Sequence, residues 1–244
     1  MTIYSTAVHL SQGAVHFWQI DLSYDRKRVE VCRRLLSKDE TERADRFHLE
    51  KHRARFIAAR GAMRMILALY ADLQPHQVRF FYGTNGKPEM AADLNNCELK
   101  FNLSHSRDRA LFAVAARSRV GVDIEFIDHN VATEYIARRY FSSGEVRTLR
   151  ALPAPQQAVA FFSCWTRKEA YTKAVGEGLS LALDSFEVAF MPELSASLVR
   201  THACPDDRSQ WRIYDIPTTQ DYAAAIAVEG TNHNLQQQQW DWPP

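Results

Sequence analysis

The pattern of apolar and polar residues changes its period several times along the chain. Residues 14–22 alternate in places, which predicts an early strand. After it the pattern favours helices: Ser37 with Glu40 three residues later forms a capping box, and apolar residues then recur at three- and four-residue spacings over roughly 48–70. Pro75 ends this run, because proline cannot continue a helix. The first part of the chain is therefore a strand followed by helices.

The next stretch is typical of strands. Residues 78–83 predict a short strand, and Asn85-Gly86 after it is a turn signal. Residues 99–106 predict a strand that runs into a loop. Two further apolar runs, 110–116 and 120–125, are interpreted as the two strands of one hairpin.

The second part of the chain repeats this order. Residues 131–175 are helical in pattern, with breaks near 142–144 and at Pro153 and Pro155, and the last helix ends toward Gly176. Three later strands are predicted at 186–190, 211–216 and 222–229. The glutamine-rich segment 231–244 is expected to be a flexible tail. Strands and helices in this order predict an α+β protein, and they suggest two halves of similar plan although no internal sequence repeat is visible.

Composition narrows the class of protein. With 46% hydrophobic and 24% charged residues, the 244-residue chain is that of a globular protein with a core. The N-terminus has no basic segment followed by a long apolar run, and no apolar stretch approaches a membrane span. The four cysteines are far apart and form no CxxC pair, so reduced thiols in the cytoplasm are expected and structural zinc is not.

The charge is unevenly spread. The net charge is only +1, but residues 26–64 hold 13 Lys or Arg against 6 Asp or Glu. Such a region suits an anionic partner, which could be a phosphate, a nucleic acid or an acidic protein surface; it could also be a solvated helix face. A nucleic-acid binder is disfavoured because the aromatic interleaving and a recognised binding motif are missing.

Two carboxylates stand in an apolar strand pattern. Asp123 and Glu125 are two residues apart, so alternation puts them on one face and Val122 and Ile124 on the other. Crowded carboxylates repel each other, and a hard divalent cation that prefers oxygen ligands relieves that repulsion. A solvent-facing pair at a strand end is the plainer interpretation of these two residues alone.

Three more motifs carry polar chemistry. In the helix pattern WTRKEAYTKAVGEGL (165–179), Glu169 and Lys173 lie on one face, either as a simple exposed pair or as a partly buried acid that needs a partner. The stretch FNLSHS (101–106) offers hydroxyls, an imidazole and loop amides that suit a phosphate. Gly86-Lys87-Pro88 is a stiff turn that presents one lysine. A serine hydrolase is disfavoured, because adjacent Ser and His have poor geometry for a triad and GxSxG is absent.

Taken together, GKP, FNLSHS, GVDIE and WTRKEAYTKAVGEGL resemble, in this order and spacing, the Sfp-type 4′-phosphopantetheinyl transferases over roughly residues 35–190. The resemblance implies a pseudo-dimeric α+β fold of two similar α/β halves with coenzyme A in the cleft between them. The implied N-terminal half is 1–106, with the basic residues that contact coenzyme A, and the implied C-terminal half is 107–230, with the metal site.

The resemblance also implies residue roles. Mg²⁺ ligands would be Asp123, Glu125 and Glu169. Glu169, or a water on the metal, would be the base that activates the attacking serine, and Lys173 would stabilise the departing phosphate. The coenzyme A contacts implied are Ser104 and His105 at the 3′-phosphate, Lys87 and Pro88 at the adenine end, and the basic residues Arg43 and Arg55.

The implied reaction moves the phosphopantetheine arm of coenzyme A to a serine of an apo carrier protein and releases adenosine 3′,5′-bisphosphate. The carrier, of fatty-acid, polyketide or nonribosomal-peptide type, is expected to be acidic around that serine. The protein is expected to act as a monomer in the cytoplasm, without nucleic acid or membrane. Two rival interpretations are a coenzyme A- or carrier-binding protein without catalysis and a magnesium-dependent nucleotide hydrolase.

Overall fold

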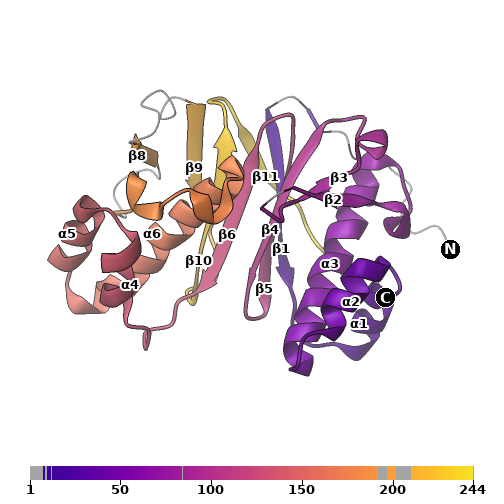
Figure 1. Ribbon diagram of the computed structural model, residues 1–244, viewed down its shortest axis with the longest axis horizontal. Coiled ribbons are helices and arrows are strands. Elements are labelled where there is room, and N and C mark those ends of the chain that lie inside the picture. The colour runs from indigo at the N-terminus through magenta and orange to yellow at the C-terminus, as the bar shows by residue number, and fades with distance from the viewer. Residues whose placement is uncertain are drawn as a thin grey trace.

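Two β-sheets stand side by side in the middle of the molecule, and a long helix covers the outer face of each (Figure 1). The computed structural model describes residues 8, 10, 11, 13–83, 85–191, 197–201 and 210–243. The four layers are therefore helix, sheet, sheet and helix, and Val15, Phe17, Val122 and Ile226 are among the buried residues that fill the space between the sheets. The predicted α+β fold is confirmed.

The N-terminal half is built on a four-stranded sheet of order β11-β1-β5-β4. Its strands are β1 (Ala14–Asp21), β4 (Leu99–Ser106), β5 (Arg109–Ala116) and β11 (Asn234–Gln237). Its helices are α1 (Arg26–Arg33), α2 (Lys38–Asp45) and the 22-residue α3 (Glu50–Ala71). A small hairpin of β2 (Phe80–Tyr82) and β3 (Pro88–Met90) and the 3₁₀ turns η1 (Pro75–Gln77) and η2 (Ala92–Leu94) complete it.

The C-terminal half is built on a three-stranded sheet of order β6-β10-β9. Its strands are β6 (Val120–Phe126), β9 (Trp211–Asp215) and β10 (Tyr222–Glu229). Its helices are α4 (Thr133–Tyr140), α5 (Ser143–Ala151) and the 22-residue α6 (Ala154–Val175). The pair β7 (Phe186–Ala189) and β8 (Ser197–Thr201) and the turns η3 (Gly178–Ser180) and η4 (Leu183–Ser185) lie at its rim.

The two halves follow one plan: a strand, two short helices, a long helix, a small strand pair and two closing strands. The order β1-β5-β4 in one sheet corresponds to β6-β10-β9 in the other. Sheet pairing places the division after Ala116, at the connection 117–119, whereas the sequence suggested 106. The expected hairpin of 110–116 with 120–125 is wrong, because β5 pairs with β4 across the tight turn at Arg107-Asp108 and β6 pairs with β10.

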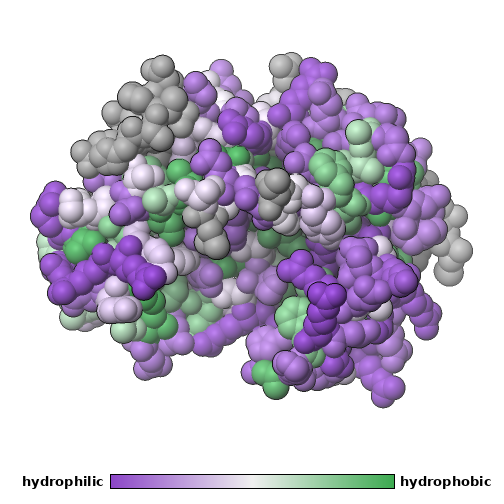
Figure 2. Space-filling view, viewed as in Figure 1, coloured by the Kyte–Doolittle hydropathy of each residue, from purple (hydrophilic) through white to green (hydrophobic). Residues whose placement is uncertain are grey.

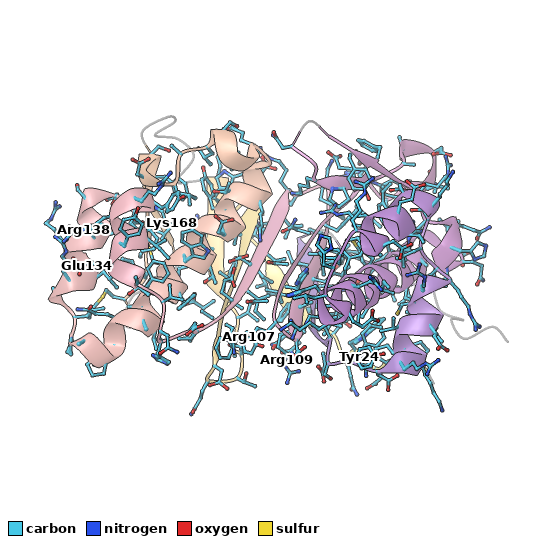
Figure 3. The ribbon with its side chains drawn as sticks, turned by 60° about the horizontal axis from the view of Figure 1, so that its bottom comes forward. Tyr24, Arg107, Arg109, Glu134, Arg138 and Lys168 are labelled. Atoms are coloured by element: carbon cyan, nitrogen blue, oxygen red, sulfur yellow. The ribbon has the colours of Figure 1, made fainter. Side chains whose placement is uncertain are left out.

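Buried ion pairs lock a short helix to the long helix in each half. Glu40, the capping-box residue of α2, receives Nε of Arg60 at 2.8 Å and Nε of Arg64 at 2.7 Å. Glu145, the capping-box residue of α5, receives Nζ of Lys168 at 2.7 Å. Lys168 projects from α6 in the C-terminal half (Figure 3). Two of the arginines in the basic N-terminal region therefore serve the core rather than an anionic partner.

The segment expected to be a flexible tail forms ordered structure on the N-terminal half. Asn234–Gln237 is the parallel edge strand β11 on β1, and the chain end lies beside α1 and α2 (Figure 1). Trp242 donates its Nε1–H to the carbonyl of Asp21 at 2.9 Å and lies under the Arg28 guanidinium at 4.6 Å. Trp240 packs against it and against the core of that half. Leu235 before the glutamine run packs between the sheets and the two tryptophans follow the run, and these apolar contacts explain the difference from the prediction.

No helix among the described residues combines the length and apolar character needed to cross a membrane. The face in Figure 2 is mainly hydrophilic, with hydrophobic residues scattered among polar ones. Cys32, Cys97 and Cys164 are free thiols, and Cys204 lies outside the described residues.

Candidate active site

The edge strands β4 and β6 meet where the two halves join, and we call this line of contact the seam. Asn102 accepts the backbone N–H of Val122 on its Oδ1 at 2.8 Å, and Ser106 Oγ accepts the N–H of Phe126 at 3.1 Å. Alternation along β4 thus turns Asn102, Ser104 and Ser106 toward β6. Sequence reasoning missed Asn102 and Ser106, although their period-two spacing with Ser104 was a signal for them.

Asp123 is the most buried acid at the seam, with 2% of its surface exposed. Its Oδ1 accepts the hydroxyl of Ser104 at 2.9 Å and Nζ of Lys173 at 2.6 Å. Its Oδ2 is buried without a hydrogen-bond partner among the described residues. An orphaned carboxylate oxygen in a protein interior is costly, so this atom is a natural place for a bound cation.

Two further carboxyls flank Asp123. Glu125 accepts the Ser106 hydroxyl at 2.7 Å, and burial, followed by the charge of Asp123, raises the pKa of Glu125 to about 7. Glu169 projects from α6, and burial together with the Asp123 charge raises its pKa as well. The structure therefore brings the three predicted acids into one electrostatic neighbourhood. Gly121 makes this approach of strand and helix possible, because a Cβ there would lie 2.2 Å from the carbonyl oxygen of Ala170.

The donor set at the seam fits a hard divalent cation. Within the described part of the chain no three His, Cys, Asp or Glu side chains already stand in a metal-binding arrangement. However, three carboxyls with an orphaned oxygen, and with raised pKa values in Glu125 and Glu169, have the oxygen chemistry and excess of negative charge that Mg²⁺ neutralises. Lys173 is the positive group that the structure places among them.

Lys173 does not form the simple helix-surface pair with Glu169 that was one interpretation of the sequence. Its Nζ reaches across the seam to Asp123 and, at 3.0 Å, to Ser104. Burial works to lower the pKa of Lys173, but the carboxylates of Asp123, Glu169 and Glu125 outweigh it and raise that pKa. The ammonium therefore stays charged beside the acids over the physiological pH range.

Lys87, a predicted coenzyme A contact, uses its ammonium to bind two backbone carbonyls of the C-terminal half. Its Nζ donates to the backbone carbonyl of Lys173 at 2.6 Å and to that of Val120 at 3.1 Å. Burial lowers the pKa of Lys87 to about 8. Lys87 thus ties its loop to the last turn of α6 and the start of β6, while Pro88 lies beside it in the wall of a cavity.

The predicted basic contacts are spread over the N-terminal half. His105 points away from the seam residues and is exposed, yet desolvation in its surroundings, and then the charges of Lys173, Arg55 and His52, lower its pKa. Arg55 on α3 is paired with Asp108 at 2.7 Å, a partner that sequence reasoning missed. Arg43 lies on the exposed side of α2, with its guanidinium 5.4 Å from the centre of the Phe56 ring. His105 therefore feels the charges of both Arg55 and Lys173, whereas Arg43 is not among the groups that act on it.

A cavity of about 570 Å³ opens beside the acids and is lined by both halves. Glu169 and Lys173 form part of its wall. Lys87 and Pro88 belong to its N-terminal side, and Arg139 and Tyr140 at the end of α4, which the sequence did not single out, belong to its C-terminal side. Apolar groups make up much of the rest of the lining: Leu103, Leu181, Ala182 and Leu183.

Comparisons with known proteins agree on one family. The profile described as "4′-phosphopantetheinyl transferase superfamily" matches residues 119–227, and the one described as "4′-phosphopantetheinyl transferase, N-terminal" matches residues 24–118. The 4′-phosphopantetheinyl transferase HetI of Nostoc sp. is 38% identical over 91% of this chain and 90% of its own length. The 4′-phosphopantetheinyl transferase Sfp of Bacillus subtilis is 29% identical over 79% of this chain and 82% of its own.

One solved structure is a holo-(acyl-carrier-protein) synthase from Bacillus anthracis in complex with CoA (3′,5′-ADP). It is 19% identical and covers 46% of this chain and 96% of that chain, with a TM-score of 0.37. This likeness is too low to bear on the present fold.

Proposed function

The chain belongs to the 4′-phosphopantetheinyl transferase superfamily, and we propose that it transfers the 4′-phosphopantetheine group of coenzyme A to a serine of an apo carrier protein. The observation that carries this proposal is the convergence of Asp123, Glu125, Glu169 and Lys173 at the seam, beside a cavity open to both halves. Acids, a charged lysine and room for a ligand are the components that transfer of a phosphoryl-linked group requires.

Asp123, Glu125 and Glu169 would hold Mg²⁺ in this proposal. When bound, the ion would neutralise the negative charge of the coenzyme A diphosphate. The orphaned Oδ2 of Asp123 and the raised pKa values of Glu125 and Glu169 support this assignment. The alternative interpretation is a coenzyme A-binding protein without catalysis. Such a protein would be expected to lack one of these carboxyls, and all three are present.

Proton transfer is assigned to Glu169. Burial and the nearby Asp123 charge move its pKa upward from the ordinary carboxyl range, toward the value at which a general base works well near neutral pH. It would accept the proton of the carrier serine as the serine oxygen attacks the β-phosphorus of coenzyme A. The bond from that phosphorus to the bridging oxygen breaks, and adenosine 3′,5′-bisphosphate leaves. Lys173, kept protonated by its carboxylate neighbours, would stabilise that leaving phosphate.

The remaining candidate contacts act on the donor. Ser104, His105 and Arg55 would hold the 3′-phosphate: the Arg55 guanidinium supplies the cationic donor and the His105 imidazole a neutral one, while Ser104 lies beside them in β4 with its hydroxyl bonded to Asp123. Arg43 remains a more remote candidate on the same half. Lys87 and Pro88 would shape the adenine end, with Lys87 acting through its two backbone carbonyl partners.

The carrier partner is proposed to be a fatty-acid, polyketide or nonribosomal-peptide carrier. The protein would act as a monomer, because one chain supplies both sides of the seam. We place it in the cytoplasm, which accords with the free thiols of Cys32, Cys97 and Cys164. Nucleic acid and membranes are not part of this proposal.

A direct assay tests this function. The protein is incubated with coenzyme A, Mg²⁺ and a panel of apo-carriers, and the carriers are weighed by mass spectrometry. We expect a mass increase of one phosphopantetheine group on at least one carrier and equimolar adenosine 3′,5′-bisphosphate, both lost with a chelator. Release of phosphate from coenzyme A without a carrier would instead favour the nucleotide hydrolase, and the absence of any modified carrier would refute the transferase.

A further inference from the structure

Ser106 is the last residue of β4, and its hydroxyl makes two hydrogen bonds across the seam. It donates to Oε2 of Glu125 at 2.7 Å and accepts the backbone N–H of Phe126 at 3.1 Å. One hydroxyl can make both bonds at once, because it has a proton to donate and lone pairs to accept with. A single atom of the N-terminal half therefore holds two adjacent groups of β6, and the proposed mechanism gives it no step.

The place of Ser106 in the seam is fixed by its own half. It pairs with Arg109 of β5 across the tight turn at Arg107-Asp108, so the register of the β4–β5 ladder sets its position. The turn is held against β6 as well, because the Arg107 guanidinium lies 3.2 Å from the centre of the Phe126 ring, where the two halves meet (Figure 3). The hydroxyl is thus presented from a well-anchored strand end, as a group that orients another must be.

The two serines of β4 bind the two acids of β6 in the same way. Ser104 donates to Oδ1 of Asp123, and Oδ2 of that carboxyl has no partner in the described part of the chain. Ser106 donates to Oε2 of Glu125, and Oε1 likewise makes no hydrogen bond among the described residues. Each hydroxyl occupies one carboxyl oxygen and leaves the other for a cation. A hydrogen bond to the second oxygen of a ligating carboxylate is a common way to fix its orientation.

We propose that Ser106 is a positioning residue for Glu125, so that a hydroxyl of the N-terminal half orients a Mg²⁺ ligand of the C-terminal half. The inference rests on the proposed function, because it assumes that Glu125 binds the cation. Without the hydroxyl, the flexible Glu125 side chain would have to be ordered by the cation itself, and the lost rotamer freedom would weaken binding. The plainer role of Ser106 is to satisfy the N–H of Phe126, as Asn102 does for Val122.

The test measures cation affinity directly. Mn²⁺, which takes the same oxygen ligands as Mg²⁺, is titrated into the wild type, Ser106→Ala and Ser106→Thr, with equimolar coenzyme A and no carrier, and the free ion is read by electron paramagnetic resonance. A titration of coenzyme A alone is subtracted. We expect Ser106→Ala to weaken Mn²⁺ binding by about tenfold and Ser106→Thr, which keeps the hydroxyl, to stay within about twofold of wild type. The Mg²⁺ concentration that half-saturates carrier modification should rise by the same factor in Ser106→Ala.

Asn102→Ala is the matched control, because it removes a side-chain acceptor for a β6 N–H but no bond to an acid. Its Mn²⁺ affinity should stay within about twofold of wild type even if its melting temperature, measured for every variant, falls. Unchanged affinity in Ser106→Ala, or equal weakening in Ser106→Ala and either Asn102→Ala or Ser106→Thr, would overturn the positioning role while the wild type still modifies carriers. If the wild type binds no Mn²⁺, the role fails together with the metal site, and if it also modifies no carrier, the proposed function fails.

Discussion

The two halves of the molecule share a frame and differ on the face where each sheet meets its long helix. Trp18 and Ile20 of β1 pack into the apolar core under α3. On the corresponding face, β6 presents Asp123 and Glu125, with Lys173 of α6 bonded to Asp123. The strand that buries apolar groups in one half thus corresponds to a strand that carries penalised charges in the other, while β9 and β10 keep an apolar core against α6.

The long helices show the same contrast at matching positions. Counted from the start of each 22-residue helix, Arg64 and Lys168 occupy the same place, and each binds the capping-box glutamate of its half. The next residue is buried Met65 in α3 but Glu169 in α6. The ion pair between the long helix and the capping-box glutamate is thus present in both halves. The residue next to it is apolar in the N-terminal half and a site carboxylate in the C-terminal half.

The largest expected effect is on the transfer rate, and matched variants in the two halves separate a loss of activity from a loss of stability. Glu169→Gln removes the proposed base and metal ligand, so we expect the transfer rate to fall by about 10³- to 10⁴-fold with little change in melting temperature. The matched change in the other half, Met65→Gln, buries an amide and should cost about 1–3 kcal/mol of the free energy of unfolding while the folded protein keeps its kcat. Carrier modification and urea unfolding, measured on both, decide this. Wild-type turnover in Glu169→Gln would remove that residue from the mechanism.

The next prediction concerns the buried ion pairs that join a short helix to the long helix in each half. Glu40→Gln leaves the buried Arg60 and Arg64 guanidiniums without their carboxylate, and we expect a loss of about 3–5 kcal/mol in the free energy of unfolding. Glu145→Gln strands one cation, Lys168, and should cost less. Urea titration measures both. Equal losses in the free energy of unfolding of the two variants would mean that having two arginines on Glu40, rather than one cation, adds no stability.

A third prediction concerns the C-terminal segment, which adds a strand and two tryptophans to the N-terminal half alone. A chain ending at Gly230 lacks β11 and the two tryptophans, so it should lose about 2–4 kcal/mol through lost apolar burial. Hydrogen exchange should rise in β1 and α1 and stay low in β6 and β10. The Trp242→Phe variant keeps most of the packing but loses the bond to Asp21, and it should lose about 1 kcal/mol. Uniformly faster exchange in both sheets would contradict this assignment.

The smallest effect is a pH dependence confined to the acidic face. The pKa of Glu125 is raised to about 7 in the folded, metal-free protein, so the folded state holds a proton that the unfolded state releases at lower pH. Stability should therefore fall as pH rises from about 5 to 7, by about 1–3 kcal/mol. Glu125→Gln should flatten that slope, and Mg²⁺ should offset the fall near pH 7. Thermal melts across this pH range measure it; an unchanged slope in the variant would assign the effect to another group.

Much of the fold follows from local signals in the sequence. The capping box at Ser37 and the helix end at Gly176 appear in the structure as predicted, and the predicted break near 142–144 is the start of α5, where Ser142 and Glu145 form a capping box that was not predicted. The two-fold plan could not be recognised as a repeat, because matching positions hold Trp18 and Ile20 in one half and acids in the other. Strand pairing was also beyond local patterns: β5 could join either neighbour, and the two-residue turn after β4 decided it.

The site residues that lie in sequence motifs could be predicted, whereas the contacts between them could not. Asp123, Glu125 and Glu169 were found because each lies in a recognisable pattern, and the structure brings them together. The bond of Lys173 to Asp123 and the two carbonyl partners of Lys87 depend on how α6 packs on β6, which no spacing along the chain encodes.

Strand β11 near the C-terminus pairs with β1 near the N-terminus, and this pairing sets the order in which the two sheets can be completed during synthesis. The N-terminal half leaves the ribosome first, but the outer edge of β1 has no neighbour until residues 234–237 emerge. Until then an exposed strand edge is available for wrong pairing, which is a known hazard of incomplete sheets. The first half to be made is therefore the last to be closed, because its edge strand is synthesised after the whole C-terminal half.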